Sequence, residues 1–259
     1  MNTLYGRWDA THSASISLDG DKVARWNDIS GDGVDLVSSG SSRPKFISNG
    51  INGKPAIRFE GTGDIALASE VTHPTYGTNP FTWIIVLKAE STGRWDNIFS
   101  TNDAPWSSLN RNGGWRSIAI CSNGVHGWAG PSDKLDINIG TKFNVVSLMF
   151  DGNTATIYHN LVKKGSWTPS GWNEAKQGYV VMGMAMQNSH DYNGYIGEAL
   201  AYTNVMPETT LFAIVERLIT KWGKYHIVLK YRVLLTLNNT RIYAIFFYVL
   251  PGGYYINIS

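Results

Sequence analysis

The sequence predicts an all-β fold, an antiparallel two-sheet sandwich closed by one amphipathic C-terminal helix. Two observations predict the sandwich: short apolar runs recur between turn signals, and the chain contains 27 glycines. A third observation predicts the helix, because one segment near residue 210 has a helical stripe of apolar residues instead of a short run. The 259 residues suit one large β domain with a substantial core, so no disulfide framework is needed.

Two hairpins are the clearest local elements. Each consists of two apolar runs joined by an Asp-Gly turn, a pattern typical of a tight connection. In the first hairpin, strands 15–18 and 22–26 flank the turn 19–20. In the second, strands 143–150 and 154–159 flank the turn 151–153. Further strands are predicted at 53–59, 82–87, 117–122, 179–184 and 197–202. The run 82–87 is apolar throughout, which indicates a strand buried on both faces.

The segment from Pro207 to Lys224 is predicted as the helix. Its apolar residues fall on one stripe: Leu211, Phe212, Val215, Leu218, Ile219 and Trp222. Pro207 suits the first helical turn, and Glu208 suits the positive end of the helix dipole. Gly223 is expected to be the residue that ends the helix.

We expect one domain over residues 1–224 and a separate apolar tail over 225–259. The tail contains no Asp, Glu or Trp, but it holds six of the 13 tyrosines. Three interpretations stay open: an appended β-hairpin, a segment that pairs with another subunit, and an extension that is no part of the natural domain. An isolated apolar hairpin is poorly stable in water, which favours a partner if the segment is native.

Charge and composition exclude several function classes. The net charge is +2, only 16% of residues are charged, and no Lys/Arg run occurs, so no nucleic-acid partner is expected. The apolar run 242–250 is too short to span a bilayer. The N-terminus has no signal-peptide pattern, so we expect synthesis in a cytoplasm. The single cysteine, Cys121, is expected to be a small buried side chain.

Several short motifs, taken in order, resemble a known family. They are Trp8-Asp9-Ala10, Leu18-Asp19-Gly20, Trp26-Asn27-Asp28, Asn49-Gly50-Ile51-Asn52-Gly53-Lys54-Pro55, Phe150-Asp151-Gly152-Asn153, Ile157-Tyr158-His159-Asn160 and Tyr195-Ile196-Gly197-Glu198-Ala199-Leu200-Ala201-Tyr202. Over about residues 5–224 the chain is similar to the concanavalin A-like lectin/glucanase superfamily. The similarity is to the laminin G-like domains of phage tail and virion proteins and of bacterial surface proteins. The resemblance implies a jelly roll that often binds glycans, and a place in a virion or, alternatively, on a cell surface or outside the cell.

The acid pattern of the glucanases in this superfamily is missing. Those enzymes carry Glu-x-Asp-x-x-Glu on one strand, where carboxylates on one sheet face act as acid and nucleophile. Here Glu198 has no acidic neighbour on its strand, and we expect it to be a rim or strand-end carboxylate. The chain is therefore expected not to be an enzyme.

Aromatic residues in polar surroundings are the candidates for glycan contact. Trp106, Trp115, Trp128 and Trp172 lie among Gly, Ser and Asn, outside the clear apolar runs. Sugar rings pack on aromatic faces, while polar groups such as those of Tyr192 and Asn193 bind the hydroxyls. The alternative is that these tryptophans plug or cover the core. Four others are assigned to the core: Trp8, Trp26, Trp83 and Trp222.

Calcium is the one cofactor that the sequence offers. Asp28, Asp32 and Asp35 lie in the loop 28–35, where oxygen side chains at alternating positions before a glycine resemble a calcium loop, but Ser39 stands where a distal Glu would complete it. A polar turn is the alternative. Asp191, grouped with Asp96 and Asn97, is a second candidate.

Three functions are compatible with these features. The first is a non-catalytic lectin-like module, a phage tail, receptor-binding or capsid decoration protein that attaches to cell-surface or environmental glycans. The second is a structural virion protein, which residues 225–259 join to other virion proteins or to a second copy of the chain. The third is a glycoside hydrolase, which requires two carboxyls in one cleft.

Overall fold

A computed structural model describes residues 3–38, 43–61, 67–70, 79–90, 96–102, 116–121, 124–128, 134–137, 139–168, 179–183, 191–223, 236–237 and 240–241. Only the backbone is described for 96, 101–102, 116–121, 124–128, 134–137, 236–237 and 240–241.

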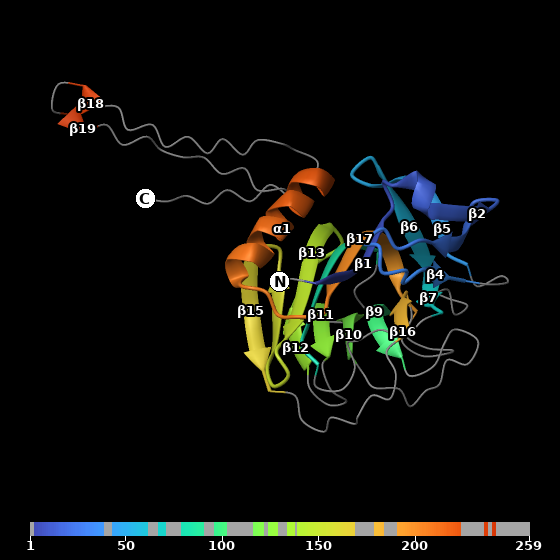
Figure 1. Cartoon of the computed structure of the whole chain (residues 1–259). Coiled ribbons are helices and arrows are strands. Elements are labelled where there is room, and N and C mark those ends of the chain that lie inside the picture. Colours follow the sequence, from blue (N-terminus) through green and yellow to red (C-terminus); the bar gives the residue numbers. More distant parts are fainter. Residues whose placement is uncertain are drawn as a thin grey trace.

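The strands pair in antiparallel fashion and form two layers (Figure 1). We call the layer that carries the helix the helix-side sheet. It runs β5 (Lys45–Ile51), β6 (Lys54–Glu60), β17 (Asn193–Tyr202), β8 (Phe81–Ala89), β13 (Phe143–Phe150), β14 (Ala155–His159) and β15 (Val162–Trp167). Strand β1 (Leu4–Asp9) continues the β6 edge of β17.

The opposite layer contains the shorter strands. It runs β2 (Ile16–Asp19), β3 (Lys22–Trp26), β4 (Leu36–Val37), β7 (Leu67–Ser69), β16 (Tyr179–Met182), β9 (Asp96–Asn102), β10 (Arg116–Cys121), β11 (Gly124–Trp128) and β12 (Lys134–Ile137). A short 3-10 turn, Ser13–Ser15, precedes β2. Lys22 of β3 lies opposite Lys45 of β5, which joins the two layers at one corner.

The core lies between the layers and is dominated by aromatic rings. Trp8 and Trp83 of the helix-side sheet contact Phe99 of the opposite layer, with ring centroids 6.1 and 4.8 Å apart. Both indole nitrogens are satisfied: Trp8 donates to the Val34 carbonyl at 2.9 Å and Trp83 to the Tyr5 hydroxyl at 3.0 Å. The prediction that Trp8, Trp26, Trp83 and Trp222 belong to the core is confirmed, since all four are fully buried.

The predicted helix is confirmed as α1 (Glu208–Trp222), which packs on β13 and β8. Four residues of its apolar stripe are buried, and Phe212 and Ile219 are partly buried. Phe81 to Leu87 of β8 are consequently buried on both faces, as expected. The predicted end of the helix is also confirmed, but Gly223 is extended (φ −69°) and not left-handed. The Asn52 side-chain amide, from the β5–β6 turn, instead donates to the Trp222 carbonyl at 2.9 Å.

The all-β prediction is confirmed, including both Asp-Gly hairpins, where Gly20 and Gly152 have φ of 64° and 98°. Strands that the sequence did not reveal are β1, β4, β5, β7, β9, β11, β12 and β15. Of the tail, only β18 (Thr236–Leu237) and β19 (Thr240–Arg241) are described, as an antiparallel pair, so the boundary at 224 stays a prediction. No helix among the described residues is long and apolar enough to cross a membrane.

Candidate functional site

Most of the predicted glycan contacts lie outside the described side chains. Trp106, Trp115 and Trp172 belong to ranges that are not described, and for Trp128 only the backbone, in β11, is. Tyr192 is fully buried against Phe59, and its hydroxyl donates to the Tyr195 carbonyl at 3.2 Å. Its ring is therefore a core side chain and not a surface for a sugar. Of the predicted glycan ligands, Asn193 is the one that is described and partly exposed.

The acidic loop at Asp28 is a hydrogen-bonded turn. Both oxygens of Asp28 accept hydrogen bonds, Oδ1 from the amides of Arg7 and Ser30 (2.8 Å each) and Oδ2 from the Ser30 hydroxyl (2.7 Å). Asp35 accepts from the Asp28 amide (2.8 Å) and from Arg25 (2.9 Å). Asp32 is exposed. These bonds account for Asp28 and Asp35 without calcium, so the geometry supports the polar-turn alternative.

The second predicted cation grouping is partly brought together. Asn97, at the start of β9, forms a parallel backbone bridge with Asp191, just before β17. Asn97 is only 1% exposed, and neither polar atom of its amide finds a hydrogen-bond partner among the described residues. An unsatisfied buried polar group costs about 1–3 kcal/mol, so a water or an ion there would be stabilising. Yet within the described ranges no three His, Cys, Asp or Glu side chains gather as metal ligands.

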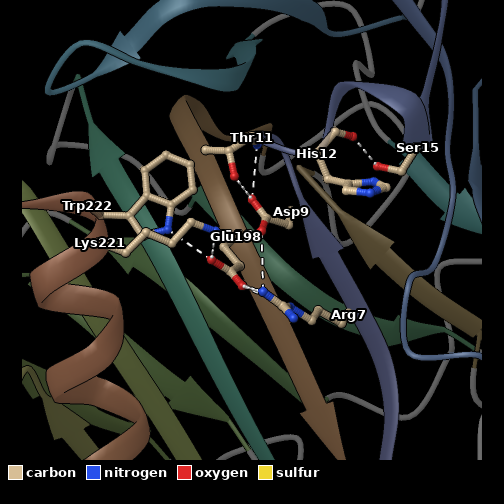
Figure 2. A network of polar contacts seen from close by, with 8 residues as sticks. All are labelled: Arg7, Asp9, Thr11, His12, Ser15, Glu198, Lys221 and Trp222. Atoms are coloured by element: carbon tan, nitrogen blue, oxygen red, sulfur yellow. Dashed lines mark hydrogen bonds and ion pairs between the residues drawn. The ribbon is translucent and has the colours of Figure 1, made fainter.

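The most connected polar cluster joins β1, β17 and the last turn of α1 (Figure 2). We call it the carboxylate clasp: Asp9, Glu198, Arg7, Lys221 and Trp222. The Lys221 ammonium lies 2.5 Å from Asp9 Oδ2 and 2.7 Å from Glu198 Oε2, and Arg7 Nη2 lies 2.8 Å from Glu198 Oε1. The Trp222 indole donates to Glu198 Oε2 at 2.9 Å.

Two adjacent carboxyls would suit a glycosidase, but this pair is closed to substrate. Glu198 is 1% exposed, and the Asp9 side chain 6%. The remaining oxygen, Asp9 Oδ1, accepts from the Thr11 amide and hydroxyl at 3.0 and 2.6 Å, so all four carboxyl oxygens have protein donors. Burial alone would raise the pKa of Asp9, but hydrogen bonds from Lys221 and Thr11 outweigh it and lower that pKa.

The expectation that Glu198 is a rim carboxylate was wrong. It lies inside β17 opposite Asp9 of β1, under the end of the helix. Gly197 makes this possible, since a Cβ there would come within 2.7 Å of the Trp222 ring. The clasp therefore fastens the helix to the sheet.

A second polar cluster lies on the same outer face, further along β17. We call it the Tyr195 cluster: Tyr195, Arg58, Lys88, Glu90 and Asn193. The Arg58 guanidinium and the Lys88 ammonium lie 5.2 and 5.0 Å from the centre of the Tyr195 ring, within cation–π range. Arg58 also donates to Glu90 at 2.8 Å and to Asn193 Oδ1 at 2.9 Å.

The Tyr195 cluster is accessible, unlike the clasp. The Glu90 side chain is 35% exposed, and Arg58, Lys88, Tyr195 and Asn193 are each partly exposed. Burial, followed by the charge of Glu90, raises the pKa of Tyr195, so its hydroxyl stays protonated at neutral pH. The cluster thus presents a neutral hydroxyl, an amide, a carboxylate and two cations, the groups that bind sugar hydroxyls and acid groups.

Sequence reasoning identified Asn193 in this cluster and missed the other four residues. Arg58, Lys88 and Glu90 lie in or next to strands that read as core, and no local motif marks them. They become a cluster only through the pairing of β6, β17 and β8. The run Lys88-Ala89-Glu90 at the end of an apolar strand was the one available signal.

Solved structures share this fold. No family model matches the chain, and no curated protein matches it. Domain 4 of a GH43 extracellular arabinanase from Geobacillus stearothermophilus, in complex with arabinotriose, aligns with a TM-score of 0.58 and 13% identity, over 83% of this chain and 98% of that domain.

Two further similarities involve parts of larger chains. The botulinum neurotoxin serotype G binding domain gives a TM-score of 0.61 at 11% identity, over 83% of this chain and 51% of that one. A mutant GH54 α-L-arabinofuranosidase soaked with 4-nitrophenyl α-L-arabinofuranoside gives 0.62 at 13% identity, over 85% and 60%. At these identities the similarity establishes the sandwich fold.

Proposed function

We propose that this chain is a non-catalytic glycan-binding module. The observation that carries the proposal is the Tyr195 cluster, a partly exposed set of hydrogen-bonding and charged groups on paired strands of one sheet face. Asn193, Glu90 and the Tyr195 hydroxyl can bind sugar hydroxyls, and the strands beneath them fix their geometry. The loop residues Trp106, Trp115, Trp128 and Trp172 remain additional candidates for stacking.

The solved neighbours support this proposal. The arabinanase domain, described as a complex with arabinotriose, matches over nearly its whole length, and it is not the whole enzyme. A stand-alone sandwich of this fold is thus compatible with sugar binding. The closed state of the Asp9–Glu198 pair supports the non-catalytic half, because those carboxyls have no room for a glycosidic oxygen.

The test is binding without turnover. Purified chain is probed on a glycan array and on intact bacterial cells, and bound glycans are assayed for released reducing ends. We expect binding to at least one glycan, no released ends, and weaker binding by the Asn193→Ala/Glu90→Gln double variant. The control is Lys164→Ala, on exposed β15 at the far edge of the sheet. Absence of binding on both surfaces would overturn the proposal, and released reducing ends would overturn its non-catalytic half.

We also propose that the chain is a component of a phage particle. It rests on the resemblance of the motifs around Trp8, Trp26 and Glu198 to laminin G-like virion domains. Mass spectrometry of purified particles tests it: the chain should be found in the particles, and its absence from them would contradict this placement.

A further inference from the structure

Basic residues on neighbouring strands form one row that starts at β3, at the corner where the two layers join, and continues across the helix-side sheet. Lys22 lies opposite Lys45, Lys45 opposite Arg58, Arg58 opposite Tyr195, and Tyr195 opposite Lys88. Directly opposed residues of antiparallel strands point to the same face, and strands lie about 4.8 Å apart. Four cations and one tyrosine therefore line a path roughly 20 Å long across β3, β5, β6, β17 and β8. We call it the basic row.

Like charges directly opposite one another destabilise a sheet, so the row has an electrostatic cost. Its middle is compensated: Lys45 pairs with Glu60 at 2.6 Å, and Arg58 with Glu90 at 2.8 Å. The hydrogen bond between Lys45 and Glu60 favours the charged form of both groups, since it lowers the pKa of Glu60 and raises that of Lys45.

The two ends of the row differ from its middle. Neither Lys22 nor Lys88 forms an ion pair with any carboxylate in the described part of the chain. The contact recorded for the Lys88 ammonium is with the ring of Tyr195. Among the described residues, each end of the row therefore has an ammonium group without an ion pair, with hydrogen-bonding groups between them; the charge of Lys22 also helps to lower the pKa of the nearby Glu60.

We propose that the basic row binds a linear polysaccharide that carries carboxylates, which lies across the strands. Lys22 and Lys88 bind acid groups of the chain, while Asn193, Glu60 and Glu90 bind its hydroxyls. This inference rests on the proposed glycan binding and names the class of glycan.

The acids of the row favour a polysaccharide over a nucleic acid. Glu60 and Glu90 flank the row on one side and would repel the dense phosphates of a nucleic-acid backbone, whereas they can accept hydrogen bonds from hydroxyls. Acid groups on a glycan are separated by sugar rings, which matches separated lysines. The row also presents no apolar side chain for insertion into a lipid surface.

The test uses polygalacturonate and the same polymer with its carboxylates methyl-esterified. We expect polygalacturonate in the gel to retard the full chain in affinity electrophoresis, and the methyl ester not to retard it. Binding to polygalacturonate should weaken as the salt concentration rises. The double variant Lys22→Gln/Lys88→Gln should weaken binding about tenfold, because the loss of each exposed ion pair weakens it about threefold and the two effects multiply. The matched control is Lys163→Gln/Lys164→Gln, both exposed on β15.

The outcomes separate the two proposals. Equal binding of the acid and its ester, or of the double variant and wild type, overturns the basic row as an acid-binding site and leaves glycan binding intact. Failure to bind any glycan, charged or neutral, overturns both. Duplex DNA or phosphatidylserine vesicles that bind as tightly, with the same loss in the double variant, would overturn the assignment to a polysaccharide.

Discussion

Removing the Lys221 ammonium should destabilise the domain by about 2–3 kcal/mol at pH 7. Asp9 Oδ2 and Glu198 Oε2 lie 2.5 and 2.7 Å from the same nitrogen, hence no more than about 5 Å from each other. At that distance two like charges repel by about 3 kcal/mol at an effective dielectric constant of 20. Arg7 offsets part of this repulsion. Breaking a buried ion pair costs about 3–5 kcal/mol, and the cost is smaller here because the Lys221 side chain is 30% exposed and solvent screens its charge.

The destabilisation of Lys221→Met should depend on pH. In the wild type the pKa of Asp9 lies below its usual value, so this group stabilises the fold above about pH 4 and less below it. Without Lys221 its hydrogen bond and its charge no longer lower that pKa, and burial is opposed by the Thr11 hydrogen bonds alone, so we expect the pKa of Asp9 to be higher in the variant than in the wild type. The folded variant then releases this proton at a higher pH than the folded wild type does, so the difference in stability from wild type grows between pH 4 and pH 7.

Urea unfolding followed by tryptophan fluorescence at pH 4 and pH 7 measures this difference. Lys163→Met on exposed β15 is the matched control and should change stability by less than about 0.5 kcal/mol. If Lys221→Met changed stability at pH 7 by no more than the control does, or lowered it equally at pH 4 and pH 7, the reasoning about the clasp would be refuted.

Three further predictions concern burial, packing and cation binding. Burial, and next the charge of Lys164, lowers the pKa of His159 to about 4, below the ordinary value of 6.5. Stability should therefore fall by about 1–2 kcal/mol from pH 7 to pH 4, after halving the full shift for screening, and His159→Gln should lack this part of the pH profile. Gly197→Ala should lower the urea midpoint by the equivalent of about 1–3 kcal/mol, because the new methyl group would come 2.7 Å from the Trp222 ring. Millimolar calcium should raise the thermal midpoint by a few degrees in wild type and not in Asp191→Asn, and an unchanged wild-type midpoint would reject the cation.

The local elements could be predicted because their signals are local. Apolar runs, Asp-Gly turns and a helical stripe depend only on neighbouring residues, and they predicted α1 and both hairpins correctly. Strand β5 was missed because it is bulged between Ile47 and Ile51, which breaks its alternation. Strand β9 was missed because its sequence, DNIFSTN, is largely polar.

The sites could not be predicted for the same reason. Asp9 and Glu198 come from opposite ends of the chain, and the basic row takes its residues from β3, β5, β6, β17 and β8. A slip of one residue in any strand would turn its side chain to the other face, so only the register reveals the row. The balanced net charge concealed it, and so did the absence of a Lys/Arg run.

One irregularity places the clasp and the row on the same face. Tyr195 and Glu198 are three residues apart, and in a regular strand that spacing puts side chains on opposite faces. The register of β17 against β8 shifts between Ile196 and Glu198, so Tyr195 lies opposite Lys88 and Glu198 opposite Val86. Lys88 and Val86 are two residues apart and share a face, so Tyr195 and Glu198 share it as well.

The consequence is a division of the outer face of the helix-side sheet. On one side of the shift, α1 covers the sheet, and the clasp fastens its last turn through Glu198 (Figures 1 and 2). On the other side, the outer face of β8 changes from fully buried at Val86 to partly exposed at Lys88, and the Tyr195 cluster begins. Gly197, the residue at the shift, also lies against the Trp222 ring. The same shift in register therefore separates the part of the sheet that the helix covers from the partly exposed part where we propose that a glycan binds.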